Sequence, residues 1–125
     1  MEEDASVLIV GGMLVLKKYH CPVEITVEVL GGKWKTRILW ELYHKNCHFS
    51  DLRRAIPDIT KKMLTQCLRE LEQNNLVIRM EKDGKVIRVE YALSEYGVKT
   101  IPLVTYMSEW GSNHFTHIIE SSKNI

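Results

Sequence analysis

The chain has 125 residues, of which 45% are hydrophobic and 26% charged, and this composition suits one globular domain with one core. Its formal net charge of +1, taken as an average over the whole chain, argues against a nucleic-acid partner. Three cysteines, an odd number, do not form a disulfide framework within one chain. We therefore expect a reducing, cytoplasmic location.

The first twenty residues combine an acidic start with an apolar run. Residues 1–4 are acidic, whereas a secretory signal begins with basic residues. The apolar run 7–16 has ten residues, about half of what a membrane-spanning helix needs. We expect residues 7–19 to form a helix or arm that contacts a partner subunit. The alternative is an interfacial membrane helix, which the Gly11-Gly12 pair disfavours.

Two short helices are predicted next. Pro22 suits the first position of a helix, and Gly31-Gly32 suits its end. Apolar residues between 34 and 43 recur at helical spacing and predict the second helix.

The charge is distributed unevenly along the chain. Residues 33–88 carry 13 Lys/Arg and 7 Asp/Glu, a net of +6, and the two flanks are acidic. A basic middle between acidic flanks favours a nucleic-acid contact surface, although solvated helix faces are charged as well.

A helix-turn-helix is predicted within this basic stretch. Residues 49–56 have the apolar spacing of a short helix, and Pro57-Asp58 interrupts it. Thr60 suits the N-cap of a longer helix that runs to about residue 74. A short helix, a tight turn and a longer helix make up a helix-turn-helix.

The longer helix has a polar face of a distinctive kind. Lysine and arginine bind guanine edges or phosphates, glutamine binds adenine, and threonine contacts either bases or backbone. The N-terminal half of a recognition helix is also the part that enters the major groove. We therefore expect DNA contact, rather than a merely solvated face, from Lys61, Lys62, Thr65, Gln66 and Arg69.

A β-hairpin is predicted after this helix. Residues 77–81 and 86–93 are rich in Val, Ile and Tyr, and Asp83-Gly84 between them is a strong turn signal. A hairpin directly after a recognition helix is a wing, and its basic residues suit phosphate or minor-groove contact. The alternative is a hairpin kept soluble by its cations, which are Lys82, Lys85 and Arg88.

The C-terminal part is predicted to be helical and to dimerise. Ser94 suits the cap of a helix that reaches about residue 119, with a kink or restart at Pro102. Apolar residues occur on two sides of this helix, so both sides must be buried. We expect a second copy of the chain to bury one of them, at Ile101, Val104, Met107, Trp110, Phe115 and Ile118.

Several stretches, taken together in this order, resemble the HxlR-type winged-helix regulators of bacteria and archaea. They include Cys21-Pro22, Gly31-Gly32-Lys33-Trp34, Phe49-Ser50-Asp51-Leu52, Leu64-Thr65-Gln66 and Trp110-Gly111. The resemblance covers about residues 21–115 and implies an α+β winged helix-turn-helix whose terminal helices form a dimer. It also implies that the five polar residues named above read the groove and that Lys82 and Lys85 lie in the wing.

The chain departs from the family pattern at three places. Asn75 stands where the family usually has glycine, and Val86-Ile87 where it often has proline. The apolar run 7–16 has no familiar counterpart. The expected organisation is residues 1–20 as the N-terminal arm, 21–93 as the DNA-binding domain and 94–125 as the dimerisation helix.

The cysteines raise the question of a switch. Some members of the family sense oxidants through a cysteine at the position of Cys21, where a helix N-terminus favours thiolate. The alternative is that Cys21 only fills space. Cys47, in the polar connection 45–48, is expected to be exposed and is a weaker redox candidate. Cys67 lies on the apolar face of its helix and is expected to be inert.

Metal, cofactor and catalytic motifs are not found. His44, Cys47 and His48 lack the paired spacing of a zinc site. There is no Gly-rich phosphate loop and no nucleophile signature, so we expect no enzyme and no cofactor. The sequence predicts a DNA-binding regulator, most simply a repressor that acts as a homodimer on a pseudo-palindromic operator. The alternative is a winged-helix module that binds proteins without specific DNA binding.

Overall fold

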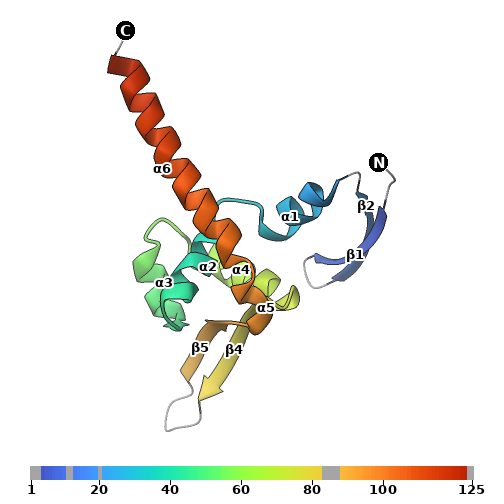
Figure 1. Cartoon of the computed structure of the whole chain (residues 1–125). Helices are drawn as coiled ribbons and strands as arrows, with labels where there is room; N and C mark the ends of the chain where they lie inside the picture. The colour runs from blue at the N-terminus through green and yellow to red at the C-terminus, as the bar shows by residue number, and fades with distance from the viewer. Residues whose placement is uncertain (1–3, 11–12, 20, 83–87, 124–125) are drawn as a thin grey trace.

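The computed structural model describes residues 4–10, 13–19, 21–82 and 88–123. Strands and helices follow one another in a mixed order along the chain (Figure 1). They are β1 (Asp4–Val10), β2 (Met13–Tyr19), α1 (Pro22–Leu30), α2 (Lys35–His44), β3 (Cys47–His48), α3 (Phe49–Ala55), α4 (Lys61–Gln73), β4 (Val77–Lys82), β5 (Arg88–Leu93), α5 (Glu95–Val98) and α6 (Ile101–Lys123).

The N-terminal segment is a β-hairpin, so the helical form of the helix or arm expected over residues 7–19 is wrong. β1 pairs with β2 in antiparallel register, with Val7 opposite Leu16 and Val10 opposite Met13. The hairpin lies beside α1 (Figure 1), and its strands contact α1 and α4. Valine and isoleucine favour the extended backbone, which outweighs the helical reading of the apolar run.

The core is formed mainly by α2, α3 and α4. Ile38 and Leu39 of α2, Leu52 of α3, and Leu64 and Leu71 of α4 have no exposed surface. In α4 the buried positions follow helical spacing, so this helix packs one side into the core and leaves the other to solvent. Packing therefore fixes which face of α4 is available for binding.

A three-stranded antiparallel sheet with the order β3-β5-β4 flanks these helices. The two long strands form the predicted hairpin, with Val77 opposite Leu93 and Lys82 opposite Arg88. The predicted Asp83-Gly84 turn and Lys85 lie outside the described residues. Strand β3 was not expected, because residues 45–48 read as a polar connection.

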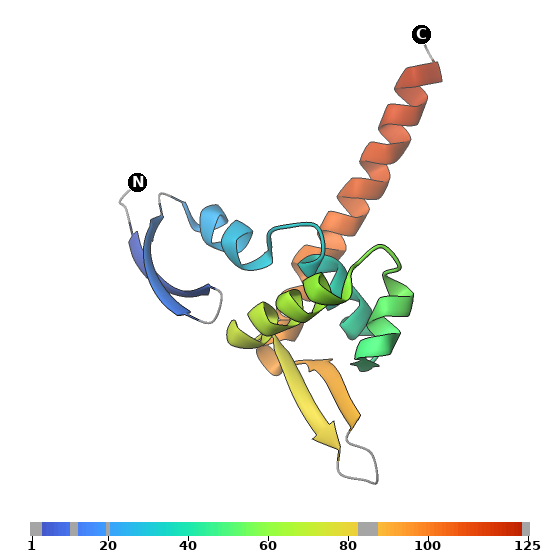
Figure 2. The same cartoon turned by 180° about the vertical axis from the view of Figure 1, so that it is seen from behind.

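The C-terminal part consists of two helices, which agrees with the restart expected near Pro102. The Ser94 hydroxyl accepts a hydrogen bond from the Gly97 backbone N–H at 2.8 Å and so caps α5. Pro102 is the second residue of α6, where a new helix starts. Helix α6 then leaves the body of the molecule, on the side opposite the β4–β5 hairpin (Figures 1 and 2). Within the described residues, no helix is long and apolar enough to cross a membrane.

Candidate nucleic-acid interface

The predicted recognition helix is present with the predicted ends. The Thr60 hydroxyl accepts a hydrogen bond from the Met63 backbone N–H at 3.1 Å, so Thr60 is the N-cap of α4. At the other end, Asn75 has a φ of 66°, the left-handed conformation that asparagine tolerates after a helix. Both ends of α4 are therefore determined by local residues, and the predicted bounds of this helix are confirmed.

The solvent face of α4 brings the five predicted DNA-reading residues together. All five are exposed, on the side of α4 opposite Leu64, Leu68 and Leu71. They line one open depression of about 590 Å³, which Glu70 and Gln73 complete. Only one of these seven side chains, Glu70, is acidic, so the surface combines cations with hydrogen-bonding groups. The members from the prediction are Lys61, Lys62, Thr65, Gln66 and Arg69.

The wing lies next to this helix in Figure 2, and its two strands contain two of the three predicted cations, Lys82 and Arg88. Arg88 is exposed at the start of β5, opposite Lys82 in the strand register. It lines a second open depression together with His48, Ser50 and Arg54. Sequence reasoning had not connected these last three residues with the wing.

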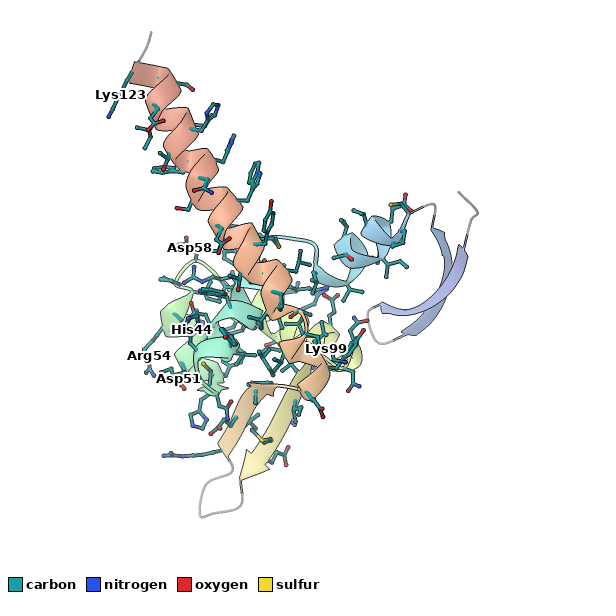
Figure 3. The ribbon with its side chains drawn as sticks, viewed as in Figure 1. His44, Asp51, Arg54, Asp58, Lys99 and Lys123 are labelled. Carbon is teal, nitrogen blue, oxygen red and sulfur yellow. The ribbon has the colours of Figure 1, made fainter. Side chains whose placement is uncertain are left out.

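A network of hydrogen bonds fixes the start of α3 against the wing. The His48 backbone N–H donates to Asp51 Oδ2 at 2.8 Å, and the His48 Nδ1–H donates to the Val89 carbonyl at 2.9 Å. The first of these bonds holds the pKa of Asp51 below its ordinary value. Asp51 also pairs with Arg54, and both residues are labelled on α3 in Figure 3. The first helix of the helix-turn-helix and the wing are thus held as one surface.

The three cysteines differ in their surroundings. Cys21 is half-buried and occupies the N-cap of α1, directly before Pro22. Cys47 is buried in β3, which overturns its expected exposure, because the strand pairs with β5 and turns the thiol inward. Burial raises the pKa of Cys47 and of Cys67. Among the described residues, no group of three His, Cys, Asp or Glu side chains could hold a metal ion.

The predicted dimer residues of α6 fall into two groups. Ile101 and Val104 are buried within their own protomer, where the start of α6 packs on α2, so they are not available to a partner. The exposed group is Met107, Trp110, Phe115 and Ile118, with exposed fractions of 47, 59, 68 and 53%.

A helix-turn-helix with an exposed, cation-rich second helix and an adjoining β-hairpin defines a winged-helix DNA-binding protein. The family model of the HxlR-like helix-turn-helix matches residues 29–119. The chain belongs to this family and is a DNA-binding transcriptional regulator.

Individual relatives agree with this assignment. The chain is 45% identical over 102 residues to the HTH-type transcriptional regulator YtcD of Bacillus subtilis, which covers 82% of this chain and 81% of the relative. The solved structure of the redox regulator HypR in its oxidised form is similar with a TM-score of 0.72 and 42% identity, covering 74% of this chain and 96% of HypR. Diamide-treated YodB from B. subtilis gives a TM-score of 0.65 and 32% identity, covering 74% and 93%.

Proposed function

We propose that the protein is a sequence-specific regulator that binds DNA as a homodimer, with α4 in the major groove. The observation that carries the proposal is the exposed face of α4, where five polar and cationic side chains line one depression. An ordinary surface helix is also amphipathic, so amphipathicity alone does not indicate DNA binding. The evidence for DNA binding is that the polar face consists of cationic and hydrogen-bonding side chains and lies beside the wing. Lysine and arginine bind phosphate or guanine, and glutamine binds adenine in a bidentate manner.

A second copy of the chain is the proposed partner of α6. The helix has 23 residues, and only Ile101 and Val104 are buried. An isolated helix is marginally stable in water, and most helical stability in proteins comes from packing. Large apolar side chains project from the rest of α6, as they do from α1 at Val23 and Val27. Burying these two helices against a second copy removes that surface from water.

The dimer implies the form of the operator. Two α4 helices related by a twofold axis would read two half-sites about 34–36 Å apart, so the operator is a pseudo-palindrome. We propose that the protein is a repressor. A bound dimer can block a promoter through DNA binding alone, whereas an activator also needs a surface that contacts the transcription machinery.

Oxidation of Cys21 is the proposed signal. Cys21 is the half-buried thiol at the start of α1, whereas Cys47 and Cys67 are buried. Diamide would accept two electrons and two protons from Cys21 and a second thiol, leaving a disulfide and the hydrazine. Structures have been solved of the relative HypR in its oxidised form and of the relative YodB after diamide treatment.

Salt dependence of DNA binding tests the interface. The logarithm of affinity should fall linearly with the logarithm of salt concentration, with a slope of about −0.9 per phosphate contact. Lys62→Ala should make the slope shallower by about one such step, whereas Lys99→Ala, at the end of α5 (Figure 3), should leave it unchanged. Arg69→Ala should weaken operator binding by about 1–3 kcal/mol if it reads a base. An affinity that is flat in salt on every duplex would favour the protein-interaction module instead.

A footprint on the protein's own upstream DNA, with and without diamide, tests the signal. Cys21→Ser should still protect the DNA and should lose the response to diamide. An unchanged response in that variant would eliminate Cys21 as the sensor.

A further inference from the structure

The carboxylate of Glu70 is held between two side chains from different helices. Lys35 Nζ lies 3.0 Å from Glu70 Oε2, and Gln66 Nε2 lies 3.5 Å from Glu70 Oε1, the outer limit of a hydrogen bond. Gln66 and Glu70 both line the depression on the DNA-facing side of α4. Glu70, one member of the ion pair, therefore contacts Gln66, which is expected to read a base.

This pair differs from an ordinary surface ion pair. The side chain of Lys35 is 13% exposed and that of Glu70 is 21% exposed, so solvent screens their attraction only in part. Lys35 Nζ also donates to the Val29 carbonyl of α1 at 3.4 Å. One ammonium group thus touches the end of α1 and the last turn of α4, from its place at the first residue of α2.

The contact favours one orientation of the Gln66 amide. A carboxylate oxygen only accepts hydrogen bonds, so the amide nitrogen of Gln66 faces Glu70 and not the amide oxygen. The oxygen and the second N–H of Gln66 stay free for a base. These are the two groups that a bidentate pair with adenine N6 and N7 requires.

DNA binding requires that the negative charge of Glu70 be neutralised, and Lys35 provides the positive charge. Glu70 is the one acidic residue in the depression on α4, and alone it would repel nearby phosphates. Lys35 neutralises it from the inner side, where the ammonium does not occupy the DNA-facing surface.

We propose that Lys35 and Glu70 are positioning residues that determine specificity: Glu70 orients Gln66 for adenine, and Lys35 anchors and neutralises Glu70. The inference rests on the proposed function, because it concerns the same face of α4. It adds that the base preference of Gln66 depends on two residues that do not touch the base.

A double-mutant cycle tests the role of Glu70. The probe is a duplex selected from a random library by the wild-type protein, together with its single-base variants. Gln66→Ala should lower discrimination at one adenine-containing base pair by about tenfold. Glu70→Ala should lower it at the same base pair, and the double variant should lose little more than either single variant.

The role of Lys35 is tested separately by affinity for all duplexes. Lys35→Met leaves the Glu70 carboxylate unpaired near the DNA and should weaken binding to selected and unrelated duplexes alike, by about tenfold. Adding Glu70→Gln should restore unrelated-duplex binding to within about twofold. Lys35→Arg, which keeps the cation, should resemble wild type, and Lys33→Met, an exposed lysine outside the pair, is the matched charge control.

The outcomes separate this inference from the proposed function. If the wild-type protein selects no sequence, the proposed function fails. If it selects a sequence but Glu70→Ala keeps full discrimination, or its effect adds to that of Gln66→Ala, the orienting role is overturned. If circular dichroism shows that any of these variants is unfolded, the conservative variants Lys35→Arg and Glu70→Gln provide the test. The inference requires that both keep the wild-type base preference, and a changed preference in either one overturns it.

Discussion

Gly97 lies where the turn after α4 meets α5, and no larger residue fits there. The backbone N–H of Ser94 donates to the Leu76 carbonyl at 3.0 Å, which brings the two segments together. A Cβ added at Gly97 would lie 1.9 Å from that carbonyl oxygen, whereas real Cβ contacts are essentially never shorter than 3.0 Å. Gly97→Ala therefore forces two backbone segments apart by about 1 Å, since neither atom belongs to a flexible side chain.

The expected cost follows from two effects. Moving the Leu76 carbonyl disrupts its hydrogen bond to Ser94, which costs about 0.5–1.5 kcal/mol. Overpacking a filled site costs about 1–3 kcal/mol more. We expect the free energy of unfolding to fall by about 1.5–4.5 kcal/mol and the Tm to fall by roughly 10 °C.

The assay is urea unfolding followed by circular dichroism at one fixed protomer concentration, because the proposed dimerisation would make the midpoint concentration-dependent. Val98→Ala is the matched control, since Val98 is the next residue and is 48% exposed. It should change the free energy of unfolding by no more than about 0.5 kcal/mol. If Gly97→Ala is as stable as this control, the two segments can separate freely and the reasoning is refuted.

Other consequences of the local structure are open to test. Thr60→Ala should cost about 1 kcal/mol in urea unfolding because the N-cap of α4 is lost, and an unchanged midpoint would contradict the cap. The folded-state pKa of Asp51 is lowered, so its contribution to stability is complete above the ordinary value near 3.8 and is lost as pH falls through the folded-state pKa. The stability gap between wild type and Asp51→Asn should therefore narrow below about pH 4 in acid titrations, and a constant gap would be inconsistent with that sign. Iodoacetamide should alkylate Cys21 well before Cys47 and Cys67 in timed mass spectra, because burial raises the pKa of the other two thiols.

The helix-turn-helix could be predicted because its signals are local. Thr60 as N-cap, Asn75 after the helix and the 3.6-residue spacing of apolar residues in α4 each depend on neighbours in sequence. The two wing strands were predictable for the same reason, since alternating β-branched residues flank a turn dipeptide. The exposed face of α4 then follows, because the helix buries the opposite side.

Features that depend on distant contacts could not be predicted. Strand β3 exists because Cys47 and His48 pair with Tyr91 and Glu90, more than forty positions away, and nothing in residues 45–48 indicates this. The burial of Ile101 depends in the same way on the position of α2. The ion pair of Lys35 with Glu70 also joins two helices, so only the folded chain brings them together.

The N-terminal hairpin was missed for a different reason. Two apolar runs that flank a glycine pair are a recognised hairpin signal. The same run also has the composition of a helix, and periodicity does not separate the two in short apolar stretches. Seven consecutive paired positions, from Asp4 with Tyr19 to Val10 with Met13, decide the matter.

The near-neutral charge of the chain is compatible with DNA binding because only nearby charges act on the phosphates. Residues 33–88 have a net charge of +6, and much of the compensating negative charge lies in the flanks. At 0.1 M salt the Debye length is about 10 Å. Glu120 is nineteen residues beyond the start of α6, which at 1.5 Å per residue is about 28 Å along the helix. At this ionic strength it scarcely opposes the cations of α4. At 0.01 M salt the Debye length is about 30 Å, and the charge of Glu120 then begins to oppose the cations of α4. The gain in DNA affinity on lowering the salt concentration should therefore be smaller than the cations alone would give.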